Sequence, residues 1–239
     1  WNGTNWTEVN DLGTGRYNTA SSKGTSTSAL LFAGRTPPGG TTAAIKTFTE
    51  SWNGTSWTEV GDLNLARYGH GGAGADNTAA LGFGGYATPP NGLVKNTEVW
   101  NGVSWTEQGD LSTAKEYAGA AGTSTSALSI GGDTSAPGAS SSNATEIWDG
   151  TSWTEVNDLN TARGYLGGQG TQTAALAFGG EIPGMQTLTE LWNGTNWTAV
   201  NAMNTARGTL GSGSGTAPTS LAVGGWKAPG VAVEVESWN

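Results

Sequence analysis

The stretch WDGTSWTEVNDLNTAR at 148–163 decides the fold, because it is one of five similar copies along the chain. The other copies are WNGTNWTEVNDLGTGR at 1–16, WNGTSWTEVGDLNLAR at 52–67, WNGVSWTEQGDLSTAK at 100–115 and WNGTNWTAVNAMNTAR at 192–207. Their opening tryptophans, together with Trp238, recur at intervals of 44 to 51 residues. A period of this length is typical of repeat architectures, in which each repeat buries its apolar surface against its neighbours.

Each copy predicts strands rather than helices. Asn-Gly or Asp-Gly between two runs rich in Trp, Thr and Val predicts a β-hairpin with a type I′ turn. Upstream lies a hydrophobic strand that ends in glycine: LLFAG at 30–34, LGFGG at 81–85, LSIGG at 128–132, LAFGG at 176–180 and LAVGG at 221–225. A run of small residues, such as YGHGGAGA at 68–75, predicts one more strand before it. Five units of four antiparallel strands indicate an all-β fold, a five-bladed β-propeller.

The order of these markers closely resembles the kelch repeat, whose family includes the central domain of galactose oxidase. An arginine precedes a small-residue strand, then a strand ending in Gly-Gly, a variable loop, a Glu-x-Trp strand and a Trp strand. The likeness covers residues 1–239, which are predicted to form a single domain. Two features depart from the family: it usually has six or seven blades, and it usually has Tyr where this chain has Trp before the hairpin. The copper chemistry of galactose oxidase is not carried over, because it needs Cys and several His and this chain has no Cys and one His.

The kelch order also predicts how the ring closes. The chain ends with three strands, near 208–216, 218–224 and 232–238, and begins with an outer strand near Trp6–Val9. We expect the N-terminal strand to complete the last blade, since this removes exposed strand edges. Glycine-rich inner runs fit a crowded centre. Tryptophan pairs such as Trp148 and Trp153 are expected to pack between blades.

Composition narrows the possible partners. The net charge of −9 and pI of about 4.5 disfavour binding to nucleic acid, because phosphates would be repelled. No apolar run approaches the length of a membrane span. A single closed ring predicts a monomer. Near-identical repeats resemble those of surface or virion attachment proteins, an analogy that favours an extracellular or virion-surface location while leaving the compartment open.

The sequence offers no convincing set of catalytic residues. His70 has no obvious partner and is expected to be structural, near the mouth of the axial channel. A catalytic carboxylate pair needs two unlike environments, whereas the glutamates recur identically in the copies and are expected to pair with Arg16, Arg67, Lys115, Arg163 and Arg207. The recurring Asp11, Asp62, Asp110 and Asp158 are interpreted as turn residues, with a central cation as the alternative. No catalytic residue, metal ligand or cofactor is therefore predicted.

The loops after the Gly-Gly step vary most between copies. Their first positions are the predicted ligand-binding residues: Arg35, Tyr86, Asp133, Glu181 and Trp226. Aromatic, cationic and acidic groups together can stack on and hydrogen-bond a sugar or a peptide. The sequence thus indicates a non-catalytic binding module, with carbohydrate or a protein surface as its ligand. A kelch-type protein–protein scaffold is the alternative, and a hydrolase is the third hypothesis.

Overall fold

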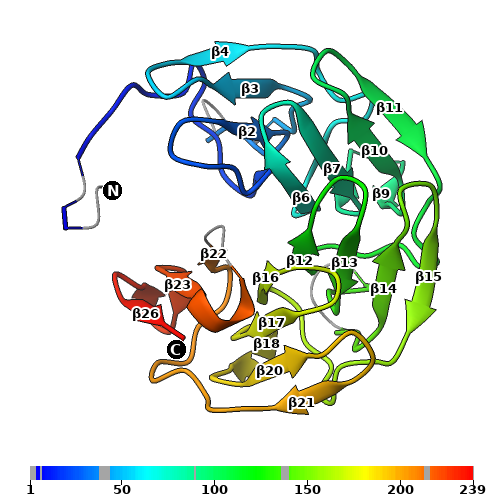
Figure 1. The fold of residues 1–239 in the computed structure, drawn as a ribbon, viewed down its shortest axis with the longest axis vertical. Coiled ribbons are helices and arrows are strands. Elements are labelled where there is room, and N and C mark those ends of the chain that lie inside the picture. The colour runs from blue at the N-terminus through cyan, green and yellow to red at the C-terminus, as the bar shows by residue number, and fades with distance from the viewer. Residues whose placement is uncertain are drawn as a thin grey trace.

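The computed structural model describes residues 4–5, 7–37, 44–88, 90–135, 140–212 and 216–238. These residues form short antiparallel strands and a single 3₁₀ turn, η1 (Ala217–Thr219). Five sheets, which we call blades 1 to 5 in chain order, follow one another around a central axis (Figure 1). The all-β, multi-bladed architecture predicted from the repeat is confirmed.

Four blades have four strands, and the innermost strand of each comes first in the chain (Figure 1). Blade 1 contains β1 (Ala20–Ser21), β2 (Ala29–Phe32), β3 (Thr49–Trp52) and β4 (Trp57–Glu59). Blade 2 contains β6 (Gly71–Asp76), β7 (Ala79–Phe83), β10 (Thr97–Trp100) and β11 (Trp105–Gln108). Blade 3 contains β12 (Gly119–Gly122), β13 (Ala127–Ile130), β14 (Thr145–Trp148) and β15 (Trp153–Val156). Blade 4 contains β16 (Gly167–Gly170), β17 (Ala175–Phe178), β20 (Thr189–Trp192) and β21 (Trp197–Ala199). Blade 5 contains β22 (Gly211–Ser212), β23 (Leu221–Val223) and β26 (Val235–Ser237).

The hairpin at the rim of blades 1 to 4 forms where the sequence predicts it, but with a different turn. Trp148 pairs with Trp153, so the loop holds four residues rather than two. Gly150 has a positive φ of 99°, while Asp149 does not, and a type I′ turn needs both. Instead, the Asp149 carboxylate accepts hydrogen bonds from the backbone N–H groups of Thr151 and Ser152, each at 2.8 Å. The expected type I′ turn is therefore wrong, because the Asx side chain replaces it with a local hydrogen-bonded loop.

The Gly-Gly step redirects the chain at the end of the second strand. Gly131 and Gly132 have φ of 58° and 101°, values that side chains rarely tolerate. A Cβ on Gly131 would lie 2.7 Å from the carbonyl oxygen of Arg163. The step therefore needs glycine both for its dihedral angles and for the close approach of the next crossover.

Glycine also lets the inner strands crowd around the axis, as predicted. In β16, a Cβ on Gly168 would lie 2.6 Å from the backbone nitrogen of Ala120 in β12. In β6, a Cβ on Gly72 would lie 2.8 Å from the carbonyl oxygen of Ser21 in β1. Contacts this close to backbone atoms leave no room for larger side chains.

A buried ion pair fastens each crossover to the blade that follows it. The cation precedes the inner strand and the glutamate lies in the third strand: Arg16–Glu50 at 2.7 Å, Arg67–Glu98 at 3.2 Å, Lys115–Glu146 at 2.9 Å, Arg163–Glu190 at 3.1 Å and Arg207–Glu236 at 3.0 Å. These contacts confirm that the recurring third-strand glutamates pair with the recurring cations. The expected structural role of this acidic register follows from its geometry.

The described part of the ring is open between blade 5 and blade 1 (Figure 1). Blade 5 ends at β26, and the described residues 7–10 form no strand and have exposed side chains. The expected pairing of residues 6–9 with the C-terminal strands is thus not formed in this structure, and Trp6 lies outside the described residues. The physical reason is that blade 1, which carries this segment, stands apart from β26 across the opening.

Candidate ligand-binding face

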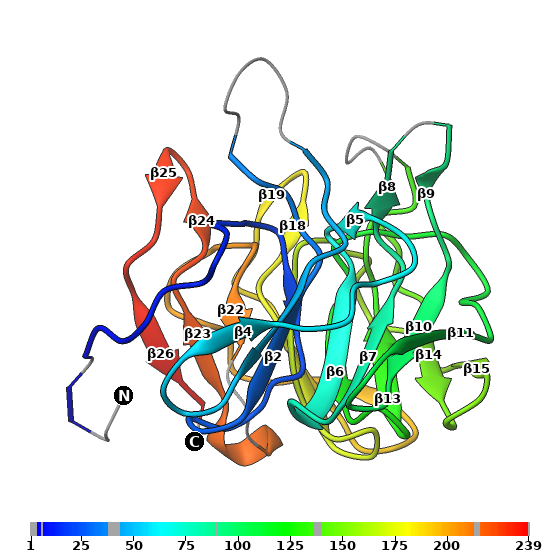
Figure 2. The same cartoon turned by 90° about the horizontal axis from the view of Figure 1, so that it is seen from above.

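The five predicted ligand-binding residues occupy equivalent places on one face. Each follows the glycine step and pairs with the residue that follows the crossover cation: Arg35 with Tyr17, Tyr86 with Tyr68, Asp133 with Glu116, Glu181 with Gly164 and Trp226 with Gly208. Small accessory strands extend from this ladder: β5 (Arg67–Tyr68), β8 (Tyr86–Ala87), β9 (Gly92–Leu93), β18 (Glu181–Ile182), β19 (Gly184–Met185), β24 (Trp226–Lys227) and β25 (Gly230–Val231). Figure 2 shows that β8–β9, β18–β19 and β24–β25 project from the same side of the ring.

A backbone ladder runs around the axis just inside this face. Gly69 donates to the carbonyl of Asn18, Tyr117 to that of Gly69, Tyr165 to that of Tyr117 and Thr209 to that of Tyr165. All five residues have φ between 52° and 61°. For Tyr117 and Tyr165 this left-handed conformation costs on the order of 1 kcal/mol or more each, and such strain is concentrated at functional sites.

The ladder brings tyrosines together at the mouth of the axial channel. The rings of Tyr117 and Tyr165 stack with centroids 4.0 Å apart, and Tyr68 lies 6.3 Å from Tyr117 and 5.5 Å from Tyr86. Asn18 donates a hydrogen bond of 2.9 Å to the Tyr117 hydroxyl. Burial, assisted by the nearby negative charge of Glu116, raises the pKa of Tyr165 to about 12. The Tyr165 phenol therefore stays protonated and able to donate a hydrogen bond at neutral pH.

Charged groups border the tyrosines. The guanidinium of Arg35 lies over the Tyr68 ring at 4.4 Å and near that of Tyr17 at 5.8 Å. Beside it, Glu116 and Asp133 are only 4% and 2% exposed. Ser141 donates to Asp133 at 2.9 Å, whereas Glu116 Oε2 has no hydrogen-bond partner within the described residues. Buried carboxylate oxygens without a hydrogen-bond partner are uncommon in folded proteins.

The two carboxyl groups titrate abnormally because they are buried. Burial, strengthened by the charge of Asp133 and opposed by Arg35, raises the pKa of Glu116 to about 7. Burial also raises the pKa of Asp133, against the hydrogen bond from Ser141. Both shifts have the same sign and the same leading cause.

A cavity of about 290 Å³ opens beneath the tyrosines, with Asn18, His70, Tyr117 and Tyr165 among its lining residues. His70 also lines a second axial cavity of about 220 Å³. Burial, together with the charge of Arg67, holds its pKa well below the usual value, so the imidazole is neutral. His70 therefore lies near the channel mouth, where the sequence placed it.

Lys23 occupies the axial channel beyond His70. Its ammonium group donates to the carbonyl oxygens of Ala120 in blade 3 and Gly168 in blade 4. Burial lowers its pKa to about 7. Lys23 therefore lines the second axial cavity and at the same time hydrogen-bonds to blades 3 and 4.

The structure brings four of the five predicted residues into this cluster and leaves one out. Arg35 and Tyr86 both neighbour Tyr68, Asp133 pairs with Glu116, and the backbone carbonyl of Glu181 lies 3.4 Å from the Ser141 hydroxyl. Trp226 is 44% exposed on the β24–β25 hairpin beside the opening. Sequence reasoning missed Glu116, Tyr117 and Tyr165. A signal for them exists, since the two residues after each crossover cation differ between copies: YN, YG, EY, GY and GT.

In the described ranges, no group of three or more His, Asp and Glu side chains could hold a metal ion. No helix among the described residues is long and apolar enough to cross a membrane.

The sheets arranged radially about a channel define the class of this protein: it has a β-propeller fold. The structure of this chain is similar to the solved structure of YjhT, with a TM-score of 0.77. The two share 14% sequence identity over 95% of this chain and 85% of that chain, a likeness of fold alone. No protein-family model matches the chain, and no curated protein matches its sequence.

Glu116 makes stability depend on pH. Its folded pKa of about 7 lies above the ordinary value of 4.5 for a glutamate, so between these values the folded protein holds a proton that the unfolded chain has released. This contribution to stability is complete below pH 4.5 and is lost as pH rises through 7. We expect Glu116→Gln to flatten this part of the profile in urea unfolding measured from pH 4.5 to 8. The exposed Glu155→Gln in β15 is the control, and an unchanged slope for Glu116→Gln would contradict the assignment.

Proposed function

We propose that this chain is a non-catalytic binding module of five kelch-like blades that recognises carbohydrate through the face just described. The observation that carries the proposal is the stacked pair Tyr117 and Tyr165 at the channel mouth, bordered by Arg35, Glu116 and Asp133. Aromatic faces pack against the C–H surfaces of a sugar ring. Buried carboxylates and a guanidinium then supply directional hydrogen bonds to its hydroxyls.

Two features support binding rather than catalysis. An acid–base pair needs environments that drive two pKa values apart, whereas burial raises the pKa of Glu116 and of Asp133 alike. The two residues are also paired through their backbones: the N–H of Glu116 donates to the carbonyl of Asp133 at 2.9 Å, and the N–H of Asp133 donates to the carbonyl of Glu116 at 2.7 Å. A preformed rigid site suits recognition, since little ordering is needed when the ligand binds.

A screen of the whole chain against a glycan array tests the proposal. We expect a selective set of glycans to be retained, and Tyr165→Ala to weaken binding about tenfold, equivalent to about 1.4 kcal/mol. Trp226→Ala is the control, because this exposed aromatic residue lies outside the tyrosine cluster. A wild-type chain that retains no glycan contradicts the proposal. Loss of binding with Trp226→Ala but not with Tyr165→Ala contradicts the assignment of the site.

A protein–protein scaffold is the second candidate, favoured by one observation. The β24–β25 hairpin presents Trp226 at 44% and Val231 at 74% exposure on the same side of the ring as the other hairpins (Figure 2). Exposed aromatic anchors on protruding loops are common in protein interfaces. In this case a ligand would protect the hairpin tips from proteolysis, whereas a glycan would leave them accessible.

A further inference from the structure

The axial cavity of about 220 Å³ is bounded by the inner strands of all five blades. Residues of β1, β6, β12, β16 and β22 line it, and most of its lining residues are glycine, alanine or serine. Lys23 and His70 are the only titratable side chains among the described residues that line it. The cavity therefore combines a wall of backbone groups with one cation and one imidazole.

Lys23 stands where the other four-stranded blades have glycine. The third residue after the start of the inner strand is Gly74 in blade 2, Gly122 in blade 3 and Gly170 in blade 4, with φ of 153°, 97° and 115°. Lys23, at the same distance from the start of β1, has a φ of 54°. A residue with a long side chain is strained in this left-handed conformation, and such strain is concentrated at functional sites.

The local backbone explains why the Lys23 side chain reaches the axis. In a regular strand, successive side chains alternate between the two faces. Next to Lys23 the ladder is interrupted: Ser22 N–H donates to the Leu30 carbonyl at 3.0 Å, but Leu30 N–H donates to the Ser22 hydroxyl, also at 3.0 Å. Lys23 thus leaves the strand pattern, and its ammonium group crosses the channel to the carbonyls of Ala120 and Gly168.

The Lys23 ammonium group has no carboxylate as counter-charge in the part of the chain that the structure describes. The seven ion pairs found there all use other Lys and Arg side chains. Two carbonyl dipoles offset only part of a full charge, and burial lowers the pKa of Lys23 to about 7. An ammonium group can donate three hydrogen bonds, of which the carbonyls take two. One donor and the positive charge are therefore left for a ligand.

His70 gives the cavity a second polar group without a partner. It is 7% exposed, and neither Nδ1 nor Nε2 has a hydrogen-bond partner within the described residues. Buried polar groups are usually satisfied, and a neutral imidazole offers one N–H donor and one acceptor nitrogen. Burial, together with the charge of Arg67, holds the pKa of His70 well below its usual value. The imidazole can therefore donate a hydrogen bond in the cavity without adding a second charge.

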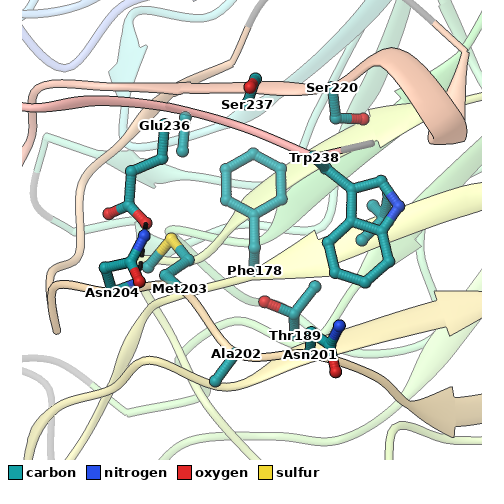
Figure 3. A pocket seen from close by; sticks show the side chains of 12 residues that line it. Phe178, Thr189, Asn201, Ala202, Met203, Asn204, Ser220, Glu236, Ser237 and Trp238 are labelled. Atoms are coloured by element: carbon teal, nitrogen blue, oxygen red, sulfur yellow. Dashed lines mark hydrogen bonds between the residues drawn. The ribbon is translucent and has the colours of Figure 1, made fainter.

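The cavity between blades 4 and 5 differs from the axial cavity in its electrostatics (Figure 3). It has a volume of about 170 Å³, and Figure 3 shows the Phe178 ring and the Trp238 indole around it. Glu236 is the one charged residue among its described lining residues, and it already accepts hydrogen bonds from Asn204 and Arg207. A charge without a counter-ion is thus a property of the axial cavity and not of this one.

The axial cavity is continuous with the channel mouth. The cavity of about 290 Å³ beneath the tyrosines shares Thr19, His70 and Gly211 with it. A small ligand that enters past Tyr117 and Tyr165 would therefore meet His70 first and Lys23 beyond it.

We propose that the axial cavity binds a small carboxylate anion, held by the Lys23 ammonium group and the His70 N–H. A carboxylate fits this pair because it carries one negative charge and its two oxygens accept hydrogen bonds from different directions. The anion supplies the counter-charge of Lys23 and binds the protonated amine. This site is separate from the proposed recognition of carbohydrate and does not depend on it.

Calorimetric titration of the whole chain with sodium acetate tests the proposal, with acetamide as a neutral molecule of similar shape. At about pH 6 and constant ionic strength, where Lys23 is charged, we expect saturable binding of acetate. Acetamide should bind at least about tenfold more weakly. A wild-type chain that does not bind acetate, or that binds both molecules equally well, overturns the proposal.

Lys23→Gly is the most informative variant, because it installs the residue that blades 2 to 4 have at this place. It removes the cation and the left-handed strain together, so the variant is expected to fold. We expect its affinity for acetate to fall at least about tenfold, whereas Lys95→Met, which removes an exposed lysine, leaves the affinity unchanged. His70→Phe, which lacks the N–H donor, should weaken binding several-fold. Unchanged affinity in Lys23→Gly or in His70→Phe contradicts the assigned site.

The affinity for acetate is also expected to depend on pH. Binding requires the charged amine, so the dissociation constant should rise about tenfold per pH unit above the Lys23 pKa of about 7. His70 is already neutral in this range, and Arg67 stays charged. Glu116, at the channel mouth, also has a pKa of about 7, so the series is repeated with Glu116→Gln. An affinity that does not change with pH, or that loses its pH dependence in Glu116→Gln, would overturn the role of Lys23.

Discussion

Arg163→Ala is expected to lower the free energy of unfolding by about 3–5 kcal/mol, as is usual when one partner of a buried ion pair is removed. The Arg163 side chain is fully buried and donates to Glu190 at 3.1 Å. It also donates to the carbonyls of Leu188, Gly179 and Ala177, at 2.8, 3.3 and 3.3 Å. Alanine would leave a buried carboxylate and three carbonyls without this donor. Urea denaturation followed by tryptophan fluorescence measures the change.

The chain offers a matched control for this prediction. Blade 3 has Lys115 at the equivalent position, paired with Glu146 at 2.9 Å. Arg163→Lys should therefore keep the charge pair and lose about 1–2 kcal/mol for the hydrogen bonds that a single ammonium cannot reproduce. If Arg163→Ala costs no more than Arg163→Lys, the ion pair does not fasten the crossover.

Trp105→Ala is expected to destabilise the fold by about 3–5 kcal/mol, the usual range for a large buried side chain replaced by alanine. The Trp105 indole is 5% exposed, packs on Phe32 of the preceding blade and donates to Thr49. Its loss would open a cavity between blades 1 and 2. Chemical denaturation monitored by circular dichroism is the measurement.

Two milder variants separate packing from hydrogen bonding at this junction. Trp105→Phe keeps an aromatic ring but leaves the Thr49 hydroxyl without its donor, at a cost of about 1–3 kcal/mol. Thr49→Val together with Trp105→Phe removes both partners and should recover part of that loss. Equal destabilisation by Trp105→Phe and Trp105→Ala would show that the ring makes no contribution by packing.

The architecture was predictable because its signals are local and repeated. Asn-Gly and Asp-Gly steps, the Gly-Gly strand ends and the recurring Glu and Arg residues each act within one blade or on its crossover. The turn type was less accessible. An Asn-Gly step favours a type I′ turn in isolation. In this structure the side-chain oxygen of Asn53 or Asp149 accepts hydrogen bonds from two backbone N–H groups, and this stabilises a four-residue loop instead.

The candidate site was predictable only in part. The residues after the glycine step were identified because their loops differ between copies. Tyr117 and Tyr165 were not predicted as site residues, because they are brought together by backbone hydrogen bonds between blades 3 and 4. The sequence of a single repeat contains no signal for such a contact. Glu116 likewise gains its importance from burial beside Asp133, a residue 17 positions away in sequence.

The amino-acid sequence by itself determined the repeat unit, its strands, the small residues at the axis and the pairing of each crossover cation with a glutamate. These follow from hydrogen-bonding and steric preferences that act over a few residues, or between segments whose spacing is repeated five times. Only the tertiary structure decided which tyrosines stack at the channel mouth and which carboxylates lose contact with water. Those properties depend on how neighbouring blades pack against each other, because a side chain is buried by segments that lie far from it in the sequence.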